Sequence, residues 1–346
     1  MMIPLVVLNY NGRRLLEECL PTVVEAARLA THRCRVVVVD NDSTDDSVPW
    51  LGRRFPQVAV IRRPNRGLCS LNDVVAELDG PVAMLLNNDI KLAPGAVDPL
   101  VAPLFERASS CFMAAPRSWL FDGRTYEGFK TAVRWRWGLV QATALYPGHE
   151  AGTGQAGWTA SAGAALAVRT EVFLQLGGFD PLYLPGRLED LDFSFRGWMA
   201  GYHAEYVPAA VAYHRGMATF GAVFGGGGCD HLALRNTLLF HWKNLRDPRH
   251  RLRHWAGVAL RLARDAVHGA GRTGAGGRSF WHAFSDALAR WRKMGRHAIR
   301  PRGDLRRERE FFVRFHPCCI DLRHGQAAPQ ARRRGGLAHR PMGRAA

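Results

Sequence analysis

The sequence predicts an α/β fold, a mostly parallel open sheet flanked by helices and followed by a basic helical C-terminal extension. Three observations lead to this prediction: apolar runs alternate with segments of helical periodicity, the apolar runs end in polar side chains, and positive charge gathers toward the C-terminus. The chain has 346 residues, of which 47% are hydrophobic and 22% charged. This composition excludes wholesale disorder and supplies enough apolar residues for a sizeable core.

Predicted strands and helices alternate in the first ninety residues or so. Apolar, β-branched runs occupy residues 3–8, 36–39, 58–61 and 82–86, which is typical of strands buried on both faces. Apolar residues recur at helical spacing between Leu15 and Ala27, and a second helix is expected around Leu71–Leu78. A strand, a helix and a strand in about forty residues form a βαβ unit, which predicts a parallel sheet.

Polar clusters follow three of these strands. Asn9 ends the first, Asp40 and Asp42 follow the second, and Asn87-Asn88-Asp89 follow the fourth. Ligands of an open parallel sheet bind outside the carboxyl ends of its strands, so these clusters point to one site. Asp89 can supply an oxygen ligand to Mg²⁺ or Mn²⁺, a cation that would neutralise a nucleotide diphosphate. Taken alone, a strand-end aspartate is more often a turn former.

Three carboxylates occur within four residues at Glu189, Asp190 and Asp192, at the start of a segment with helical periodicity. Such charges repel one another unless they cap a helix N-terminus, bind a cation or act as a base. Capping and general-base catalysis both remain open for this cluster. His214 ends an apolar run and is most simply structural, but near Asp89 its imidazole could complete a metal shell.

Other motifs carry less information. Residues 152–157 fit G-x-G-x-x-G but do not follow a predicted strand, so we expect a flexible loop there, and no P-loop motif occurs. Gly225–Gly228 is expected to be a mobile connector, either a lid over the site or a plain linker. The seven cysteines have no C-x-x-C spacing, which disfavours a disulfide framework or a zinc site and favours a reducing compartment.

The net charge of +17 lies entirely in the last third of the chain. Residues 245–346 contain 24 Lys and Arg against 7 Asp and Glu, whereas residues 1–244 contain 23 of each sign. This asymmetry indicates an anionic partner, either lipid headgroups or nucleic acid. Because residues 1–244 contain no recognisable nucleic-acid module, we expect no nucleic-acid partner, and a basic nucleic-acid-binding protein is the less favoured alternative.

Two basic amphipathic helices are expected in this last third. The first has an apolar face made of Leu252, Trp255, Ala259, Leu262 and Ala266. The second runs from Phe280 to Trp291, after a glycine-rich break at residues 269–277. Basic helices that carry tryptophan are typical of interfacial membrane anchors, so residues 245–300 predict contact with an anionic membrane surface. The alternative is that both apolar faces pack on the rest of the protein.

Several segments, in order, resemble glycosyltransferase family 2 and its bacterial rhamnosyltransferase-like members. They are residues 8–12, 38–47, 85–89, 161–169, 177–180, 189–193, 201–202 and 207–214, spread over residues 3–244. The resemblance implies the GT-A fold and an inverting, metal-dependent transfer of a sugar from a nucleotide-diphosphate donor. The sugar it favours is rhamnose, carried by deoxythymidine diphosphate, and the acceptor would be a polyprenyl-linked or cell-surface glycan.

The resemblance also implies roles for individual residues. Asp190 would be the base that deprotonates the acceptor hydroxyl, and Asp89 and His214 would hold Mg²⁺ or Mn²⁺. The residues expected to bind the donor are Asn9, Asp40, Asp42, Asn65, Gly67, Asn72, Asn87 and Asn88. Asn87 stands where the family's D-x-D motif has its first aspartate, and Leu68-Cys69 replace the usual residues after Gly67. A sugar-nucleotide-binding protein without catalytic activity is therefore the main alternative.

We expect three parts: a catalytic domain at residues 1–244, a basic helical region at 245–323 and a disordered tail at 324–346. No run of eighteen apolar residues occurs, and the N-terminus lacks the features of a secretory signal. The expected location is therefore the cytoplasm, peripheral on the inner face of the cell membrane.

Overall fold

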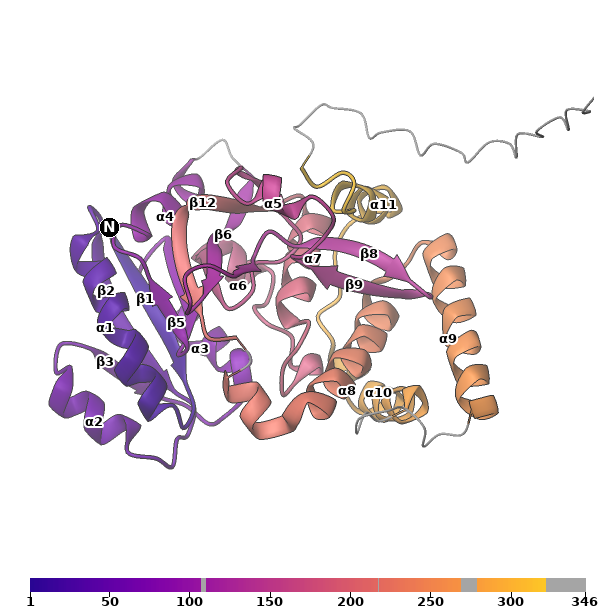
Figure 1. The fold of residues 1–346 in the computed structure, drawn as a ribbon, viewed down its shortest axis with the longest axis horizontal. Coiled ribbons are helices and arrows are strands. Elements are labelled where there is room, and N and C mark those ends of the chain that lie inside the picture. The colour runs from indigo at the N-terminus through magenta and orange to yellow at the C-terminus, as the bar shows by residue number, and fades with distance from the viewer. Residues whose placement is uncertain (107–109, 217, 269–278, 322–346) are drawn as a thin grey trace, which may run out of the picture.

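A ten-stranded mixed sheet forms the centre of the fold (Figure 1). The computed structural model describes residues 1–106, 110–216, 218–268 and 279–321. The main path of the sheet is β10-β12-β6-β11-β4-β1-β2-β3, with β5 paired to β12 and β7 paired to β6. The strands are β1 (Met2–Asn9), β2 (Arg33–Asp40), β3 (Ala59–Arg62), β4 (Val82–Asn87), β5 (Ile90–Leu92), β6 (Cys111–Leu120), β7 (Tyr126–Gly128), β10 (Gly157–Thr159), β11 (Ala165–Arg169) and β12 (His203–His214).

The four predicted strands are confirmed as β1 to β4, and they pair in parallel. β1 lies between β2 and β4, with Asn9 opposite Asp40 and Leu8 opposite Asn87. Their carboxyl ends therefore reach the same edge of the sheet. β11 interrupts the parallel order because it runs antiparallel to both β4 and β6.

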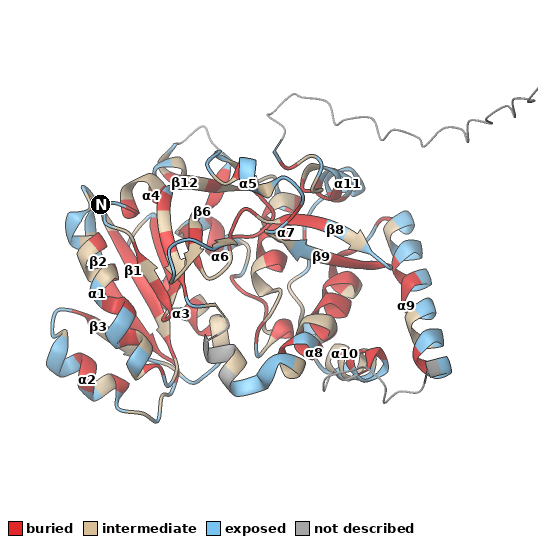
Figure 2. Cartoon of the chain, in the orientation of Figure 1, coloured by how far each residue is buried: buried red, intermediate tan, exposed pale blue. Residues whose placement is uncertain are grey.

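Helices flank the sheet, and Figure 2 shows the buried residues concentrated in the strands between them. The helix predicted after the first strand is confirmed as α1, which buries Leu16, Cys19, Leu20 and Val23 at helical spacing. The helix expected around Leu71–Leu78 is confirmed as α3. The helices of this part are α1 (Arg13–Leu29), α2 (Ser47–Arg54), α3 (Ser70–Glu77), α4 (Val97–Phe105), α5 (His149–Gly152), α6 (Thr170–Gln175) and α7 (Glu189–Ala200), with 3₁₀ turns η1 (Gly67–Cys69) and η2 (Pro181–Tyr183).

A second apolar cluster joins α7 to the C-terminal helices. Its buried members include Phe195 of α7, Phe240 of α8 and Phe311 of α11, and the Phe195 ring lies edge-on to the other two. The elements around this cluster are the hairpin β8 (Ala132–Arg136) and β9 (Leu139–Thr143), then α8 (Ala218–Asn244), α9 (Pro248–His268), α10 (Phe280–Met294), η3 (Gly295–His297) and α11 (Leu305–Arg314).

Two expectations about this region need correction. Gly225–Gly228 is not a loop: it lies within α8, which is kinked where Gly225 adopts φ 64° and ψ 171°. The helix predicted from Leu252 onward is confirmed as α9, and only the alternative that its apolar face packs on the rest of the protein is wrong: α9 buries His254 and Val258, while Leu252 and Trp255 on the predicted apolar face are exposed. Packing of the apolar face on the rest of the protein is seen instead for α10, which lies against α8.

Several other expectations have clear outcomes. None of the seven cysteines, all of which lie among the described residues, forms a disulfide bond. Within the described ranges, no helix is both long and apolar enough to cross a membrane. Residues 152–157 form the end of α5 and a turn that leads into β10. The glycine-rich break at 269–277 and the expected disordered tail at 324–346 lie outside the described residues.

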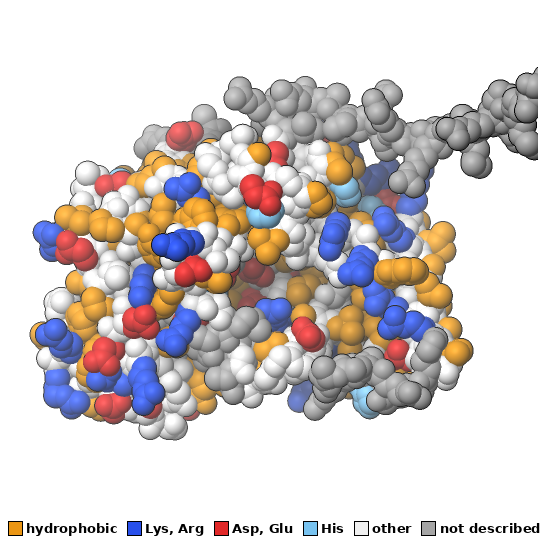
Figure 3. All heavy atoms as spheres, viewed as in Figure 1, with side chains coloured by type: hydrophobic (Ala, Val, Ile, Leu, Met, Phe, Trp, Pro, Cys, Tyr) orange, Lys and Arg blue, Asp and Glu red, His pale blue; other side chains and the backbone are white. Residues whose placement is uncertain are grey.

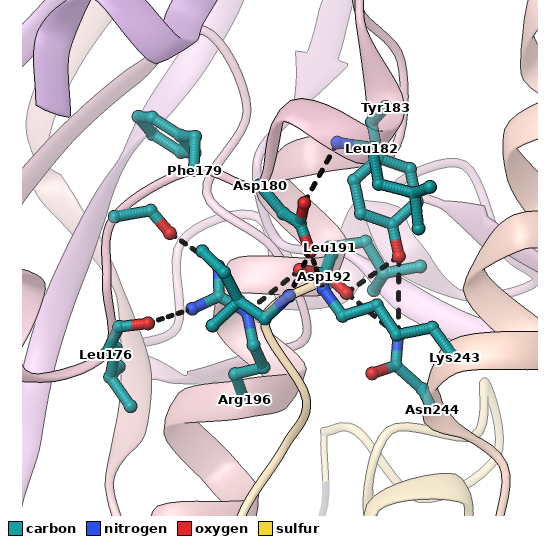
Figure 4. Close-up of polar contacts among 12 residues, drawn as sticks. Leu176, Phe179, Asp180, Leu182, Tyr183, Leu191, Asp192, Arg196, Lys243 and Asn244 are labelled. Atoms are coloured by element: carbon teal, nitrogen blue, oxygen red, sulfur yellow. Dashed lines mark hydrogen bonds and ion pairs between the residues drawn. The ribbon is translucent and has the colours of Figure 1, made fainter. Parts of the chain in front are cut away.

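A buried ion network fixes α8 to α7 (Figure 4). Lys243 Nζ donates to Asp180 Oδ2 at 2.6 Å and to Asp192 Oδ2 at 2.7 Å, and Arg196 Nε donates to the same Asp192 oxygen at 2.9 Å. Asn244 Nδ2 donates to Asp192 Oδ1 at 2.8 Å. Burial alone would raise the pKa of Asp192, but the charges of Lys243 and Arg196 bring it below its ordinary value. Asp192 therefore has a structural partner set and is not available as a base.

We expect Lys243→Met to lower the free energy of unfolding by about 3–5 kcal/mol, because it leaves two buried carboxylates without their shared cation. Urea unfolding followed by circular dichroism measures this loss. The control is Lys91→Met, which removes a 2.7 Å ion pair with Glu18 at the surface. The control should cost less than about 1 kcal/mol. Equal losses in the two variants would contradict the role assigned to Lys243.

Candidate functional site

Asn9 is the centre of a hydrogen-bonded cluster at the carboxyl ends of β1, β2 and β4. Its Nδ2 donates to Asp40 Oδ1 at 3.3 Å, and its Oδ1 accepts a 2.8 Å hydrogen bond from Asn88 Nδ2. Asp40 Oδ2 also accepts from the backbone N–H of Ser43 at 3.2 Å. All three clustered side chains are buried, with Asn9 fully so. The strand-end polar residues predicted to form one site thus lie together.

The loop that contains Asn65 and Gly67 borders this cluster. Asn41 Nδ2 donates to the Gly67 carbonyl at 3.0 Å, and Asn65 Oδ1 accepts from the Gly67 N–H at 3.1 Å. Gly67 has φ 51°, and a Cβ atom there would lie 2.8 Å from the carbonyl oxygen of Pro185. Glycine is needed at this position for both reasons. Asp42 lies at the open side of the same cluster, exposed and with φ 63°.

Two predicted donor-binding residues have other surroundings. The Asn72 amide bonds the backbone of Phe179 twice, through Nδ2 to the carbonyl at 2.8 Å and through Oδ1 from the N–H at 2.9 Å. Asn72 therefore ties α3 to the loop before Asp180. Asn87 is half-buried at the end of β4, where its backbone N–H donates to the Ala164 carbonyl at 3.0 Å.

Asp89 and His214 lie side by side, as a shared metal site would require. His214 Nε2 is 3.3 Å from Asp89 Oδ1, and both side chains are buried. His214 Nδ1 contacts Glu127 Oε1 of β7, and Glu127 Oε2 accepts from Ser118 Oγ at 2.6 Å. Burial alone would lower the pKa of His214, but hydrogen bonds to the two carboxylates raise it to about 10.

Glu127 is a site residue that the sequence analysis missed. It lies in a three-residue strand outside the segments that resemble a family motif, so no local pattern marks it. A buried histidine beside one carboxylate often has a second polar partner on its other ring nitrogen. This general tendency is the only indication in the sequence that a residue such as Glu127 exists. The sequence does not say which residue supplies that partner.

The residues around Asp89 fit a divalent cation. Asp89 is 4% exposed, and its buried Oδ1 lies 3.3 Å from His214 Nε2 without forming a hydrogen bond among the described residues. A buried carboxylate oxygen with this one long contact has room for a stronger partner, and a hard cation would be one. One carboxylate and one imidazole, with Glu127 behind the imidazole, form a donor set suited to Mn²⁺ or Mg²⁺.

Asp190 lies in the first turn of α7, facing the residues that precede β11. Ser161 Oγ donates to Asp190 Oδ2 at 2.6 Å, and Asp190 is only partly buried. The neighbouring Glu189 has a buried Oε2 without a hydrogen-bond partner among the described residues. Burial, followed by the charge of Asp190, raises the pKa of Glu189 to about 8. At neutral pH, Asp192 is paired, Glu189 is mostly protonated, and Asp190 is the accessible carboxylate of the three.

Two contacts connect Asp190 with the metal-binding group. The segment that holds Ser161 continues into β11, where Ala165 pairs with Leu86 directly before Asn87-Asn88-Asp89. The ring of Phe129 packs on Gly163 of that segment and lies 6.2 Å from the His214 ring. Figure 3 shows acidic side chains inside a recess near the middle of the face drawn. Asp40 and Asp89 thus lie at the end of β4, and the segment that holds Ser161, the partner of Asp190, leads to the same strand end.

The chain is similar to known glycosyltransferase sequences. Residues 5–152 match the family model for glycosyl transferase family 2. N-acetylglucosaminyl-diphospho-decaprenol L-rhamnosyltransferase of Mycobacterium tuberculosis is 27% identical over 270 residues, covering 69% of this chain and 83% of that protein. The uncharacterised protein y4gI of Sinorhizobium fredii is 28% identical over 199 residues, covering 54% of this chain and 22% of that protein.

Solved glycosyltransferase structures share the fold. GalNAc-T7 with UDP, GalNAc and Mn²⁺ has a TM-score of 0.55 at 18% identity, covering 87% of this chain and 59% of that one. Staphylococcus aureus TarS 1–349 in complex with UDP-GlcNAc has a TM-score of 0.52 at 14% identity, covering 84% and 81%. The expected GT-A fold is thus confirmed. The chain is a nucleotide-sugar glycosyltransferase whose residues 5–152 match the glycosyl transferase family 2 model, and it is similar to a mycobacterial L-rhamnosyltransferase.

Proposed function

We propose that this enzyme transfers rhamnose, with inversion, from a nucleotide-diphosphate donor to a lipid-linked or cell-surface glycan, using Mg²⁺ or Mn²⁺. The observation that supports this most is the convergence of Asp89 and His214 with Asp190 around the end of β4. Such a site offers a place for a charged diphosphate next to a carboxylate base. The similarity to a mycobacterial L-rhamnosyltransferase favours rhamnose as the sugar.

The donor would lie across the carboxyl ends of β1, β2 and β4. Asp40 would accept a hydrogen bond from the base, with Asn9 and Asn88 holding the Asp40 side chain in place. Asp42 lies exposed beside them, and Asn65 and Gly67 form the adjoining wall. Asn87 follows directly along β4, toward the diphosphate. Asn72 would act indirectly, by fixing the loop before Asp180.

Asp89 and His214 would bind the cation, and Glu127 would orient the imidazole by accepting from its Nδ1. When bound, the cation neutralises the diphosphate and the charge that develops on the leaving group. Asp89 Oδ1 is buried and forms no hydrogen bond among the described residues beyond its 3.3 Å contact with His214 Nε2, which leaves it able to bind the cation. His214 is held between two carboxylates, so its ring direction is fixed before a ligand arrives.

Asp190 would deprotonate the acceptor hydroxyl. The hydroxyl proton moves to the Asp190 carboxylate, the acceptor oxygen forms a bond to the anomeric carbon, and the bond from that carbon to the diphosphate breaks with the electron pair leaving on the nucleotide. Ser161 holds one oxygen of Asp190, and the N-terminus of α7 favours its negative charge. Because Glu189 is mostly protonated at neutral pH, it adds little like charge next to this base.

The acceptor and the location follow from the relative and from the charge of the chain. The mycobacterial protein is named for a decaprenol-linked N-acetylglucosamine diphosphate. A polyprenyl-linked acceptor would meet this enzyme at the inner face of the cell membrane, with residues 1–244 as the catalytic domain. Residues 245–323, and within them 245–300, would supply the contact with anionic lipid; we propose no nucleic-acid partner.

We expect Asp190→Asn to fold normally and to lose at least about 100-fold in turnover, because the amide cannot accept the proton. Turnover is measured with dTDP-rhamnose and a polyprenyl-linked glycan, and donor binding by calorimetry should stay within about twofold. Glu310→Gln, on the exposed side of α11, is the control and should leave both values unchanged. Near wild-type turnover in Asp190→Asn would remove Asp190 from the role of base.

His214→Ala and Glu127→Ala should each weaken Mn²⁺ binding in the presence of dTDP by about 10- to 100-fold, because one removes a ligand and the other its support. Loss of the free Mn²⁺ signal in electron paramagnetic resonance measures this affinity without turnover. Glu127→Gln should keep part of the affinity, since its carbonyl oxygen still accepts from Nδ1. Asp98→Ala breaks another carboxylate–His contact, 2.8 Å from His32, and serves as the control. Unchanged Mn²⁺ affinity in His214→Ala would contradict the proposed metal site.

Glu189→Gln should stabilise the protein at pH 8 by about 1–2 kcal/mol and have little effect at pH 4. The pKa of Glu189 rises on folding, so the folded state binds its proton more tightly, and this group lowers stability as pH rises from its ordinary value of 4.5 toward 8. Urea unfolding at both pH values measures the difference. Glu171→Gln, exposed on α6, should show no such pH dependence. A pH-independent effect of Glu189→Gln would contradict a buried, protonated Glu189.

A further inference from the structure

α9 presents an unpartnered apolar face along its whole length. Figure 1 places this helix at the edge of the molecule opposite to α2, and Figure 2 shows exposed residues along it. The large exposed side chains are Leu252 at 73%, Trp255 at 47%, Leu260 at 53% and Val267 at 81%. The alanines at 256, 259, 263 and 266 are also exposed. Their spacing of three or four residues places all eight on one side of the helix.

The opposite side of α9 is held firmly against the protein. His254 and Val258 are buried there, and His254 Nε2 accepts from Trp242 Nε1 of α8 at 3.0 Å. Gly257 is so close to the β8–β9 turn that a Cβ atom would lie 2.4 Å from Gly138. The orientation of α9 is therefore fixed, and its outer face is not a packing surface waiting for another part of the described chain.

Two exposed tryptophans flank this apolar face. Trp137, 64% exposed, lies at the tip of the β8–β9 hairpin, where its carbonyl accepts from Arg261 of α9. Trp281, 52% exposed, lies in the first turn of α10 beside the other end of α9, and its backbone N–H donates to Asp265 Oδ2 at 3.1 Å. Tryptophan favours the boundary between water and lipid because it combines a large apolar ring with an N–H donor.

The charge around the apolar face has one sign. Exposed arginines border it on α9 and on the adjacent hairpin, namely Arg249, Arg251, Arg253, Arg264, Arg134 and Arg136. The only acidic residue of α9 is Asp265, which is buried. Within the described ranges, Arg249, Arg251 and Arg253 form no ion pair with an acidic side chain. A partner that covers the apolar face must therefore bring negative charge around it.

We propose that α9 is the membrane-docking element of this enzyme and lies in the plane of an anionic lipid bilayer, with Leu252, Trp255, Leu260 and Val267 inserted below the headgroups. This rests on the proposed function and assigns its membrane contact to one face of one helix. α10 does not take part through its apolar side, because that side packs on α8. A second copy of the chain fits poorly, since it would oppose two arginine-rich rims.

An aromatic groove of about 550 Å³ opens beside this face, between α8, α9 and α10. Its walls include Trp242, Trp255 and Trp291, and its lining also includes Arg251 and Arg300. Trp255 belongs to both the groove and the exposed face, so the two surfaces are continuous. The guanidinium groups and the aromatic walls suit the phosphate and the upper chain of one anionic lipid in the docked bilayer.

Vesicle flotation tests the proposal with the full chain. We expect binding to phosphatidylglycerol-rich vesicles and little binding to phosphatidylcholine vesicles, with loss of binding at high salt. Leu252→Glu combined with Leu260→Glu should reduce binding to the anionic vesicles by about tenfold or more. The matched control is Leu174→Glu combined with Val313→Glu. It changes two exposed aliphatic residues, one on α6 and one on α11, and should bind like wild type.

Three outcomes would overturn the proposal: no binding of the wild type to anionic vesicles, equal binding by the two double variants, or a wild-type dimer in sedimentation that the α9 double variant dissociates. Binding of Mn²⁺ and dTDP-rhamnose by calorimetry keeps this test separate from the proposed function. The α9 double variant should retain both affinities within about twofold, because both changes lie on an exposed face and should affect only the contact with the membrane. If the wild type did not bind Mn²⁺ and dTDP-rhamnose, that result would instead count against the proposed sugar transfer.

Discussion

The register between β1 and its two parallel neighbours is the constraint on which the candidate site depends. Asn9 lies opposite Asp40, and Leu8 lies opposite Asn87, so three polar strand ends meet at one edge. A shift of one residue in either pairing would turn these side chains to the other face of the sheet. The buried, continuous aliphatic runs of β1, β2 and β4 give the sheet its core, and the hydrogen bonds of Asn9 to Asp40 and from Asn88 align the strand ends.

The cluster of Glu189, Asp190 and Asp192 shows how surroundings assign different states to similar side chains. Asp192 is fully buried and ionised because Lys243 and Arg196 reach it. Burial and the charge of Asp190 raise the pKa of Glu189 and favour its protonated form, although the charge of Arg187 acts in the opposite direction. Asp190 keeps partial access to solvent and one hydroxyl partner. The three residues are thus a structural anion, a neutral acid and an accessible carboxylate, within one turn of α7.

Much of this arrangement could be predicted from the sequence, because the features involved are local. The aliphatic runs of β1 to β4 and the polar residues that follow them are visible as patterns. The sequence makes His214 a candidate metal ligand only if it lies near Asp89, and in the structure it does. Glu127 could not be predicted, since its place beside His214 depends on the pairing of β7 with β6. The resemblance predicts that Asn72 binds the nucleotide-sugar donor, whereas in the structure its amide donates to the backbone carbonyl of Phe179. The sequence does not show that the chain brings Phe179 to this place.

In the C-terminal region the sequence left alternatives open that only the packing decides. Helical periodicity in α9 does not say which side of the helix meets the rest of the protein. Contacts with the β8–β9 turn require a small residue, so Gly257 faces inward and the leucine and tryptophan positions face outward. The glycines of Gly225–Gly228 are tolerated in α8 because the helix continues on both sides and only Gly225 leaves helical angles.

The distribution of acids makes the surface of the C-terminal extension more positive than its composition suggests. Asp247 and Glu308 are fully buried, where they bond Arg309 and His250, and Asp265 is 8% exposed. Asp247 and Glu308 therefore offset the charges of Arg309 and His250, with which they pair, rather than those of the arginines around α9. The exposed arginines around α9 therefore act with few opposing charges nearby. An anionic partner gains most by approaching the side of the protein on which the apolar residues are also exposed, since the two contributions then add at the same surface.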